Sequence, residues 1–203
     1  MTNKNELRPK GRPRKFKDED VLQHAAQAFL VDGFEAASYE HIAEAMGLSK
    51  PSLYNAFGNK TALFERVVGD YAEQAHQFMV ANFSGAETLA LGTDQLFQAA
   101  AKFYSREDAP SIGCLLIGTA LPATAQNANI QSIFSNFILT LETGLKEVIL
   151  TQYKQDAASL GRSAGQISTH ISSLVFALAV RARAGLSHEQ LSNTAEELAA
   201  ALG

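Results

Sequence analysis

The sequence lacks several features that would assign it to a class of protein at once. It has no tryptophan, a single cysteine and only 19% charged residues among its 203. One cysteine, Cys114, cannot form an internal disulfide, which favours a reducing cytoplasmic location. No apolar run approaches the roughly 20 residues that span a bilayer. The charged first residues have no apolar segment behind them, so we expect neither a secretory signal nor a membrane span.

Signatures of catalysis are missing as well. The sequence has no His-x-x-Glu-His motif, no phosphate-binding glycine loop and no Gly-x-Ser-x-Gly elbow. Its histidines lie far apart and have no cysteine partners, which disfavours a metal site. They are His24, His41, His76, His170 and His188. We therefore expect that the protein is not an enzyme and that it holds no metal or other cofactor.

Charge is distributed unevenly along the chain. Residues 1–17 hold seven basic residues and one acid, whereas residues from 71 onward hold seven basic and eleven acidic residues, within a net charge of −4. A basic arm on a mildly acidic body suggests a polyanionic partner at one end. Gly11 and Pro13 keep the arm extended, so Arg12, Arg14 and Lys15 can enter the minor groove of DNA. A disordered solubilising tail would have a similar composition.

Helical periodicity dominates the first third of the chain, and strand alternation is scarce. Acids at residues 18–20 suit the start of a first helix, which Gly33 ends. Ser38, Ser49 and Asn59 are good N-caps for three more helices. Pro51 is tolerated inside the third because it falls in the first turn, where amide hydrogens have no intrahelical partner.

Longer helices are predicted in the rest of the chain. Their expected ranges are 87–105, 112–121, 129–154, 164–184 and 188–202. The last two begin with the capping-box spacing, Ser163 with Gln166 and Ser187 with Gln190. The whole chain is therefore predicted to be all-α, with about nine helices.

The second and third helices have the spacing of a helix-turn-helix. Ala43 lets two helices cross closely, Gly47 supplies the positive φ of the tight turn, and Leu53 pins the second helix to the core. The outward side chains suit a recognition helix in the major groove; they are Ser49, Lys50, Pro51, Ser52, Tyr54 and Asn55. Lys60 opens the next helix, whose N-terminal amides suit a phosphate.

The stretch from residue 21 to residue 64 (VLQHAAQAFLVDGFEAASYEHIAEAMGLSKPSLYNAFGNKTALF) resembles the tetracycline-repressor (TetR) family of bacterial transcriptional regulators. It shares Gly33-Phe34, Ile42-Ala43, Leu53-Tyr54, Phe57 and Lys60 with the family without an insertion or deletion. Departures at Ala37, Pro51 and Asn55-Ala56 leave the operator sequence open. The resemblance implies an N-terminal three-helix domain joined by a long fourth helix to a larger helical domain. Its expected parts are a basic arm at 1–17, a DNA-binding domain at 18–64 and a ligand-binding and dimerisation domain at 65–203.

The resemblance also implies roles for individual residues. Ser38 and Tyr39 would hold the phosphate backbone, and Tyr54 and Lys60 would contact phosphates. Lys50, Ser52 and Asn55 would approach base edges, and Pro51 would touch a thymine methyl group. Two of these residues have an alternative role. Ser49 either contacts DNA or serves only as a helix cap, and Tyr54 either contacts phosphate or packs within the protein.

A dimer is expected because one helix-turn-helix reads only a few base pairs. The last two predicted helices carry apolar stripes, which are Ile167, Ile171, Leu174 and Leu178 on one and Leu191, Ala195, Leu198 and Leu202 on the other. Such stripes form either the core of one chain or a four-helix interface between two chains. The family resemblance favours the interface.

The middle of the chain is rich in phenylalanine, and the resemblance implies a cavity there for a small, mostly apolar or aromatic effector. We predict that it is lined by Phe78, Phe103, Cys114, Phe137 and His170, although His170 can also be an ordinary core residue. The expected function is a ligand-responsive repressor that binds a palindromic operator as a dimer. One alternative is a repressor that senses oxidants or electrophiles through Cys114, which can equally be a buried apolar residue. Another is a DNA-packaging protein, which would need a basic body.

Overall fold

The computed structural model describes residues 17–105 and 113–202, and this part of the chain is entirely helical, as predicted. It contains ten α-helices and one π-helical turn, η1. Their bounds are α1 Asp18–Ala36, α2 Tyr39–Ala45, α3 Lys50–Phe57, α4 Lys60–Phe83, α5 Leu89–Tyr104, η1 Leu116–Ala120, α6 Leu121–Ala123, α7 Ala128–Gln152, α8 Lys154–Ser159, α9 Ala164–Arg183 and α10 His188–Ala200.

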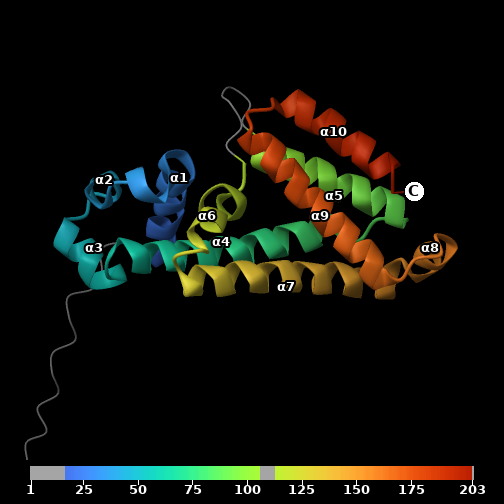
Figure 1. Ribbon diagram of the computed structural model, residues 1–203, viewed down its shortest axis with the longest axis horizontal. Coiled ribbons are helices and arrows are strands. Elements are labelled where there is room, and N and C mark those ends of the chain that lie inside the picture. The colour runs from blue at the N-terminus through green and yellow to red at the C-terminus, as the bar shows by residue number, and fades with distance from the viewer. Residues whose placement is uncertain (1–16, 106–112, 203) are drawn as a thin grey trace, which may run out of the picture.

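The helices form a small head and a larger body (Figure 1). The head consists of α1, α2 and α3 at one end of the molecule. The long helices α4 and α7 lie side by side and run from the head along the body, where α5, α9 and α10 pack together. The short helix α8 lies at the end farthest from α3. Helix α4 therefore connects the head to the body.

Helix starts follow the predicted caps. The side chains of Ser38, Ser49 and Asn59 accept hydrogen bonds from backbone amides in the first turns of α2, α3 and α4. Both predicted capping boxes are formed, at Ser163 with Gln166 and at Ser187 with Gln190. These contacts span three residues, so the local sequence is sufficient to specify them.

One predicted helix end is confirmed and two predicted boundaries are wrong. Gly33 has φ 77° and interrupts the first helix as predicted, and a further helical turn up to Ala36 follows it. The segment predicted as a helix at 112–121 is a π-helical turn followed by the short α6. The helix predicted at 129–154 ends at Gln152, because the buried Tyr153 donates a hydrogen bond to the Phe83 carbonyl (2.8 Å) and anchors the chain there. A separate helix, α8, follows.

The stripes predicted for a dimer interface lie mostly in the core of a single chain. Ile167, Ile171 and Leu178 are at most 4% exposed, and Leu191 and Ala195 are completely buried. The reason is that α10 packs along α5, while α9 packs on α7 and α5, so both stripes are covered within one protomer. The hypothesis that these five side chains form the interface is therefore wrong, and Leu174, Leu198 and Leu202 are half-buried.

Across residues 17–105 and 113–202, none of the helices combines the length and the apolar character needed to cross a membrane.

Candidate nucleic-acid interface

The turn between α2 and α3 has the geometry that the sequence predicts. Gly47 adopts φ 62°, a left-handed conformation that favours glycine. The Leu48 amide donates to the Ala43 carbonyl (2.8 Å), which closes the turn. Ala43 is 1% exposed and Leu53 is completely buried, so both serve the packing of the two helices. The result is a rigid helix-turn-helix at the end of the molecule.

The opposite face of α3 is open to solvent. Lys50, Pro51, Ser52, Tyr54 and Asn55 are all exposed, and Tyr54 exposes 56% of its surface although it is a large aromatic residue. The structure thus brings together on one helical face the side chains that the sequence assigns to DNA. An exposed tyrosine beside small polar groups suits contact with a phosphate backbone and base edges.

Lys50 has an acidic neighbour that sequence reasoning missed. Its ammonium group forms an ion pair with Glu40 of α2, and both side chains are more than half exposed. The hydrogen bond from Lys50 is the main cause that lowers the pKa of Glu40. Exposed ion pairs contribute little to stability, so Lys50 can leave Glu40 for DNA. Glu40 lies ten positions before Lys50, and the turn between the two helices brings the side chains together.

Two serines at the start of α3 contact each other. Ser49 Oγ accepts a hydrogen bond from the Ser52 amide (3.3 Å), and the two hydroxyl groups lie 2.8 Å apart. Ser49 therefore has a defined role as a cap, whereas the Ser52 hydroxyl is exposed at the front of the helix. Ser38 caps α2 in the same way and is also exposed.

Two side chains that are predicted to contact phosphate already form hydrogen bonds within the protein. Tyr39 is 7% exposed, and its hydroxyl donates to the Gly58 carbonyl (2.6 Å). Burial raises the pKa of Tyr39, and the nearby Tyr54 adds to the effect. Lys60 donates to the Glu35 carbonyl (2.9 Å), and its ammonium group lies 4.9 Å from the centre of the Phe34 ring. Arg12, Arg14 and Lys15 lie outside the described residues.

The residues predicted to bind an effector do not line a single cavity. Phe78 and Phe103 do lie together, with ring centres 5.1 Å apart, and both face a groove of about 700 Å³ between α1, α4 and α5. Tyr71 extends this aromatic surface, with its ring centre 6.0 Å from that of Phe103. Carboxylates of Glu19, Asp20 and Asp70 also line the groove, so it is more acidic than the sequence suggests.

The other three residues lie elsewhere. Phe137 packs against Phe176 (ring centres 6.1 Å apart) and lines a smaller hollow of about 200 Å³ between α4 and α7. His170 is exposed on α9, where its Nδ1 donates to the Gln166 carbonyl (2.7 Å). It is therefore neither a pocket residue nor a core residue. Cys114 is 3% exposed and lies next to the hydroxyl groups of Tyr71 and Tyr104, inside the body.

Hydrogen bonds join the body to the end of α1. Thr119 of η1 donates to the Phe29 carbonyl (3.1 Å), and Arg183 of α9 donates to the Leu30 carbonyl (2.9 Å). At the other side of α4, Glu65 accepts hydrogen bonds from Asn127 (2.9 Å) and Asn129 (3.1 Å). The head is therefore bound through α1 to η1 and α9, and α4 is bound in turn to the start of α7.

This combination of a rigid helix-turn-helix head and a helical body linked to it defines a DNA-binding transcriptional regulator. Residues 21–67 match the family described as bacterial regulatory proteins, tetR family. The matched segment contains the whole helix-turn-helix, α2 and α3. Within residues 17–105 and 113–202 there is no group of three or more His, Cys, Asp or Glu side chains placed to hold a metal ion.

Relatives of known kind are similar over nearly the whole chain. The Escherichia coli K12 protein named HTH-type transcriptional repressor BdcR is 27% identical over 195 residues, which cover 96% of this chain and 93% of BdcR. The HTH-type transcriptional repressor ComR of the same organism is 24% identical over 187 residues, which cover 92% of this chain and 89% of ComR. A cysteine mutant of the TetR family regulator CifR, solved with 26-base-pair operator DNA, is 27% identical with a TM-score of 0.74, covering 94% of this chain and 99% of CifR.

Proposed function

We propose that this protein is a repressor that binds a palindromic operator as a homodimer and leaves it when a small effector binds. The observation that carries the proposal is the exposed face of α3, a helix that is capped by Ser49 and held to the core by Leu53. That face presents a lysine, a tyrosine and an asparagine to solvent on a rigid support. The names of the relatives BdcR and ComR support repression rather than activation.

The proposed contacts are of two kinds, those that position the protein on the phosphate backbone and those that read the base sequence. Tyr54, Ser38 and the arm residues would hold phosphates and supply affinity, while Lys50, Ser52 and Asn55 would approach base edges and Pro51 a thymine methyl group. Four of the proposed contacts have weaker support, because their polar groups already serve as caps or bind backbone carbonyls; they are Ser38, Ser49, Tyr39 and Lys60. For these four, a contact with DNA requires an exchange of partners.

The proposed division of the chain is an arm at 1–17, a DNA-binding domain at 18–64 and a regulatory domain at 65–203. Helix α4 crosses the boundary between the last two, since it runs from Lys60 to Phe83. Dimerisation would use the solvent face of α9, where Val180 is 54% exposed, together with the outer face of α10. A protein that acts on operator DNA would work in the cytoplasm, and we propose no catalytic activity for it.

The groove lined by Phe78 and Phe103 is the proposed effector site. It lies between α1 of the head and α4 and α5 of the body, so an occupant changes the angle between these elements. The exposed ring of Phe103 (40%) offers a stacking surface to an aromatic compound. Because three carboxylates line the groove, we expect that the effector is not an anion.

Thiol sensing through Cys114 has less support. Burial is the largest influence on the thiol and raises its pKa, although the tyrosine hydroxyls and the amides of Leu116 and Ile117 act in the opposite direction. The thiol therefore stays protonated and poorly nucleophilic at neutral pH. We favour an effector that binds without a covalent bond.

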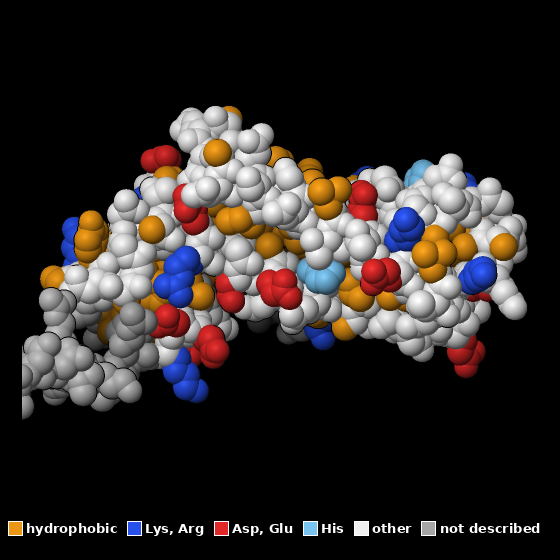
Figure 2. Space-filling model, turned by 90° about the horizontal axis from the view of Figure 1, so that it is seen from below, with side chains coloured by type: hydrophobic (Ala, Val, Ile, Leu, Met, Phe, Trp, Pro, Cys, Tyr) orange, Lys and Arg blue, Asp and Glu red, His pale blue; other side chains and the backbone are white. Residues whose placement is uncertain are grey.

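A DNA-packaging role also has less support. Figure 2 shows that basic and acidic side chains are interspersed along one long face of the molecule, with no continuous basic surface. Packaging proteins hold DNA mainly through such surfaces, because phosphate contacts supply the affinity. A basic arm on a mixed body fits a protein that grips DNA at one end.

The proposed function can be tested by footprinting the purified protein on the DNA upstream of its own coding region, over a series of salt concentrations. We expect a protected inverted repeat with half-sites about one helical turn, or a multiple of it, apart. Protection should weaken steeply with salt, because phosphate contacts release counterions.

The control is a variant with the changes Tyr54→Ala and Lys50→Ala, which removes two exposed side chains and leaves the buried face of α3 intact. Loss of protection in this variant would support the interface. Protection that persists unchanged would contradict it. Failure of the wild type to bind any duplex at low salt, when free of small molecules, would refute the DNA-binding proposal.

A further inference from the structure

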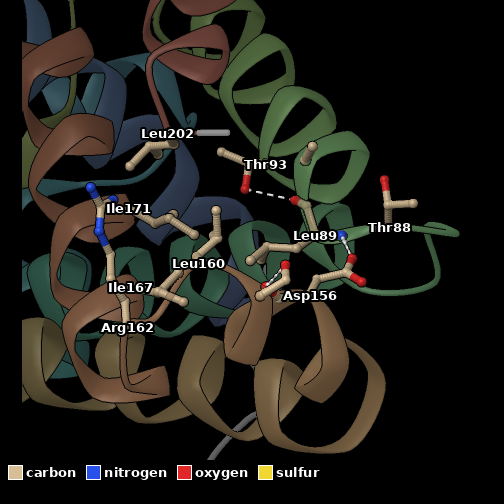
Figure 3. Close-up of a pocket in the computed structure, with 11 residues that line it drawn as sticks. Thr88, Leu89, Thr93, Asp156, Leu160, Arg162, Ile167, Ile171 and Leu202 are labelled. Atoms are coloured by element: carbon tan, nitrogen blue, oxygen red, sulfur yellow. Dashed lines mark hydrogen bonds between the residues drawn. The ribbon is translucent and has the colours of Figure 1, made fainter.

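A second hollow lies at the end of the body remote from α3. It has a volume of about 320 Å³ and is enclosed by the first turns of α5, by α8, by the N-terminal half of α9 and by Leu202 near the end of the chain. Figure 3 shows Leu89 of α5, Leu160 at the end of α8, and Ile167 and Ile171 of α9 around it. We call this hollow the distal pocket.

Most of the wall surface of the distal pocket is apolar. Leu89, Ile167 and Ile171 are at most 5% exposed, so they form the inner wall and not a projecting surface. The Thr93 hydroxyl is already used, because it donates to the Leu89 carbonyl of its own helix (2.8 Å). An occupant would therefore meet hydrocarbon along most of its length and would be held by burial of apolar surface.

The two charged residues of the pocket differ in their partners. Asp156 accepts a hydrogen bond from the Leu89 amide (2.7 Å), so its carboxylate serves the N-terminus of α5. Arg162 has no ion-pair or hydrogen-bond partner among residues 17–105 and 113–202. In Figure 3 its guanidinium group is drawn on the side of the pocket away from Asp156. Within the described residues, the charged side chain without a partner at this pocket is therefore the exposed Arg162.

We propose that the distal pocket binds a small amphipathic carboxylate, with its hydrocarbon chain against Leu160 and Ile167 and its carboxylate on Arg162. A guanidinium group is suited to a carboxylate because it offers two parallel N–H donors. The volume lies at the lower end of the range for small-molecule sites, which is about 300–1,000 Å³, so the ligand is a short chain and not a full lipid.

This site is separate from the proposed effector groove and from the DNA-reading face. None of the residues that line the distal pocket also lines the groove between α1, α4 and α5. A negative result at the distal pocket would therefore leave the proposed function unaffected, and a failure of the proposed function would leave the distal pocket unaffected. Its test requires neither operator DNA nor an identified effector.

The test uses octanoate and octanol, which share a hydrocarbon chain and differ in charge. Binding of each to the full chain is measured by calorimetry, and the site is located by methyl NMR of isoleucine residues. We expect saturable binding of octanoate, with the largest shifts at Ile167 and Ile171. Decanoate or hexanoate should change the affinity by about fourfold per methylene, as long as the chain still fits.

Three variants separate the parts of the proposal. Arg162→Gln should lower the affinity for octanoate about fivefold and leave the affinity for octanol unchanged, because only the carboxylate pairs with the guanidinium group. Arg181→Gln, an exposed arginine of α9 that does not line the pocket, is the matched control and should change neither. Ala90→Phe, at an exposed lining position, should fill the pocket and weaken both ligands.

Some results would overturn the proposal. Absence of saturable binding would remove the site. Shifts at other isoleucines, or octanoate binding unaffected by Ala90→Phe, would place the ligand elsewhere. Equal octanoate affinity in the wild type and in Arg162→Gln would refute the role of the guanidinium group.

Discussion

Tyr54 and Asn55 are neighbours on α3 that we expect to affect DNA binding in different ways. Both are exposed, and Tyr54 is the larger and more projecting of the two. Phosphate contacts carry no sequence information, whereas base-edge contacts do. Tyr54→Ala should therefore weaken binding to operator and random duplex alike. Asn55→Ala should change the preference among operator variants, with a loss of about 1–3 kcal/mol at the base pair it reads.

Both variants can be measured by competition binding on a set of single-base operator substitutions. Neither change touches Leu53 or Phe57, which hold α3 in place, so the thermal stability should stay unchanged. If Asn55→Ala lowers the affinity for every sequence to the same extent, Asn55 does not read a base. If Tyr54→Ala changes only sequence preference, the two roles are exchanged.

Cys114 gives a prediction about reactivity and pH. Its pKa is raised in the folded chain, mainly by burial, so iodoacetamide should label it slowly at neutral pH and quickly once the chain is unfolded. Because the folded state holds the thiol proton more tightly, stability should fall as the pH rises above about 8.5, the usual pKa of a cysteine. Burial raises the pKa of Tyr71 and Tyr104 as well, which adds to this alkaline loss.

Labelling is followed by mass spectrometry, and Cys114→Ser serves as the blank because the chain has one cysteine. Comparison of alkaline unfolding in the wild type and in Cys114→Ser isolates the part due to the thiol. Rapid labelling of the folded chain at neutral pH, with loss of DNA binding, would instead favour the thiol-sensing alternative.

Single residues could be predicted from the sequence where their partners are close in the chain. The caps formed by Ser38, Ser49 and Asn59 involve amides three positions away. Tyr39 and Lys60 were predicted to contact phosphate, but their polar groups meet carbonyls 19 and 25 positions away. No periodicity or motif predicts such a partner, because only the packing of α1 to α4 brings the groups together.

At the scale of elements, the contact between α4 and α7 depends on a glycine. A Cβ atom at Gly144 would lie 2.8 Å from Val80 Cγ2 and 2.9 Å from His76 Nε2, both on α4. Gly144→Ala should therefore destabilise the protein by about 1–3 kcal/mol through overpacking, reduced by the better helix propensity of alanine. The change is measured by urea unfolding.

Gly69 is the matched control, because it lies within α4 and a Cβ there would have no atom within 4 Å. Gly69→Ala should stabilise the protein by about 0.5–1 kcal/mol, since alanine loses less entropy than glycine in a helix. If both substitutions stabilise the protein equally, α4 and α7 are farther apart than the structure shows.

The bounds of a helix can be predicted from the sequence where a local signal sets them. They cannot be predicted where a contact with a distant part of the chain sets them. Both capping boxes mark real starts, at α9 and α10. The break at Tyr153 has no glycine or proline to signal it. It arises because the Tyr153 hydroxyl bonds to the Phe83 carbonyl 70 positions earlier. The sequence therefore predicts one long helix where the structure has α7 and α8.

For the whole molecule, the oligomeric state should depend on the solvent face of α9. Val180 is 54% exposed there, beside small residues, and a dimer interface would bury it. Val180→Glu should dissociate the dimer in sedimentation experiments, because a buried unpaired charge is costly. Operator affinity should fall with it, since one head reads only half of a palindrome.

The control is Val31→Glu. Val31 is also a valine with 54% exposure, like Val180, but it lies on α1 of the head. This variant should remain a dimer. Dissociation by both substitutions would indicate a general loss of stability. A Val180→Glu variant that remains a dimer would place the interface on another face.

The sequence by itself determined the all-α class, the caps, the helix-turn-helix and the resemblance to the TetR family, because each rests on contacts or patterns within a few turns of chain. The tertiary structure alone decided which apolar faces are covered. Stripes on α9 and α10 that fit a dimer are buried by α5 and α7 within one chain. It also decided that Phe78 and Phe103 share a groove while His170 faces solvent. Helical periodicity shows that a face is apolar, but the neighbour that covers it depends on how distant helices pack.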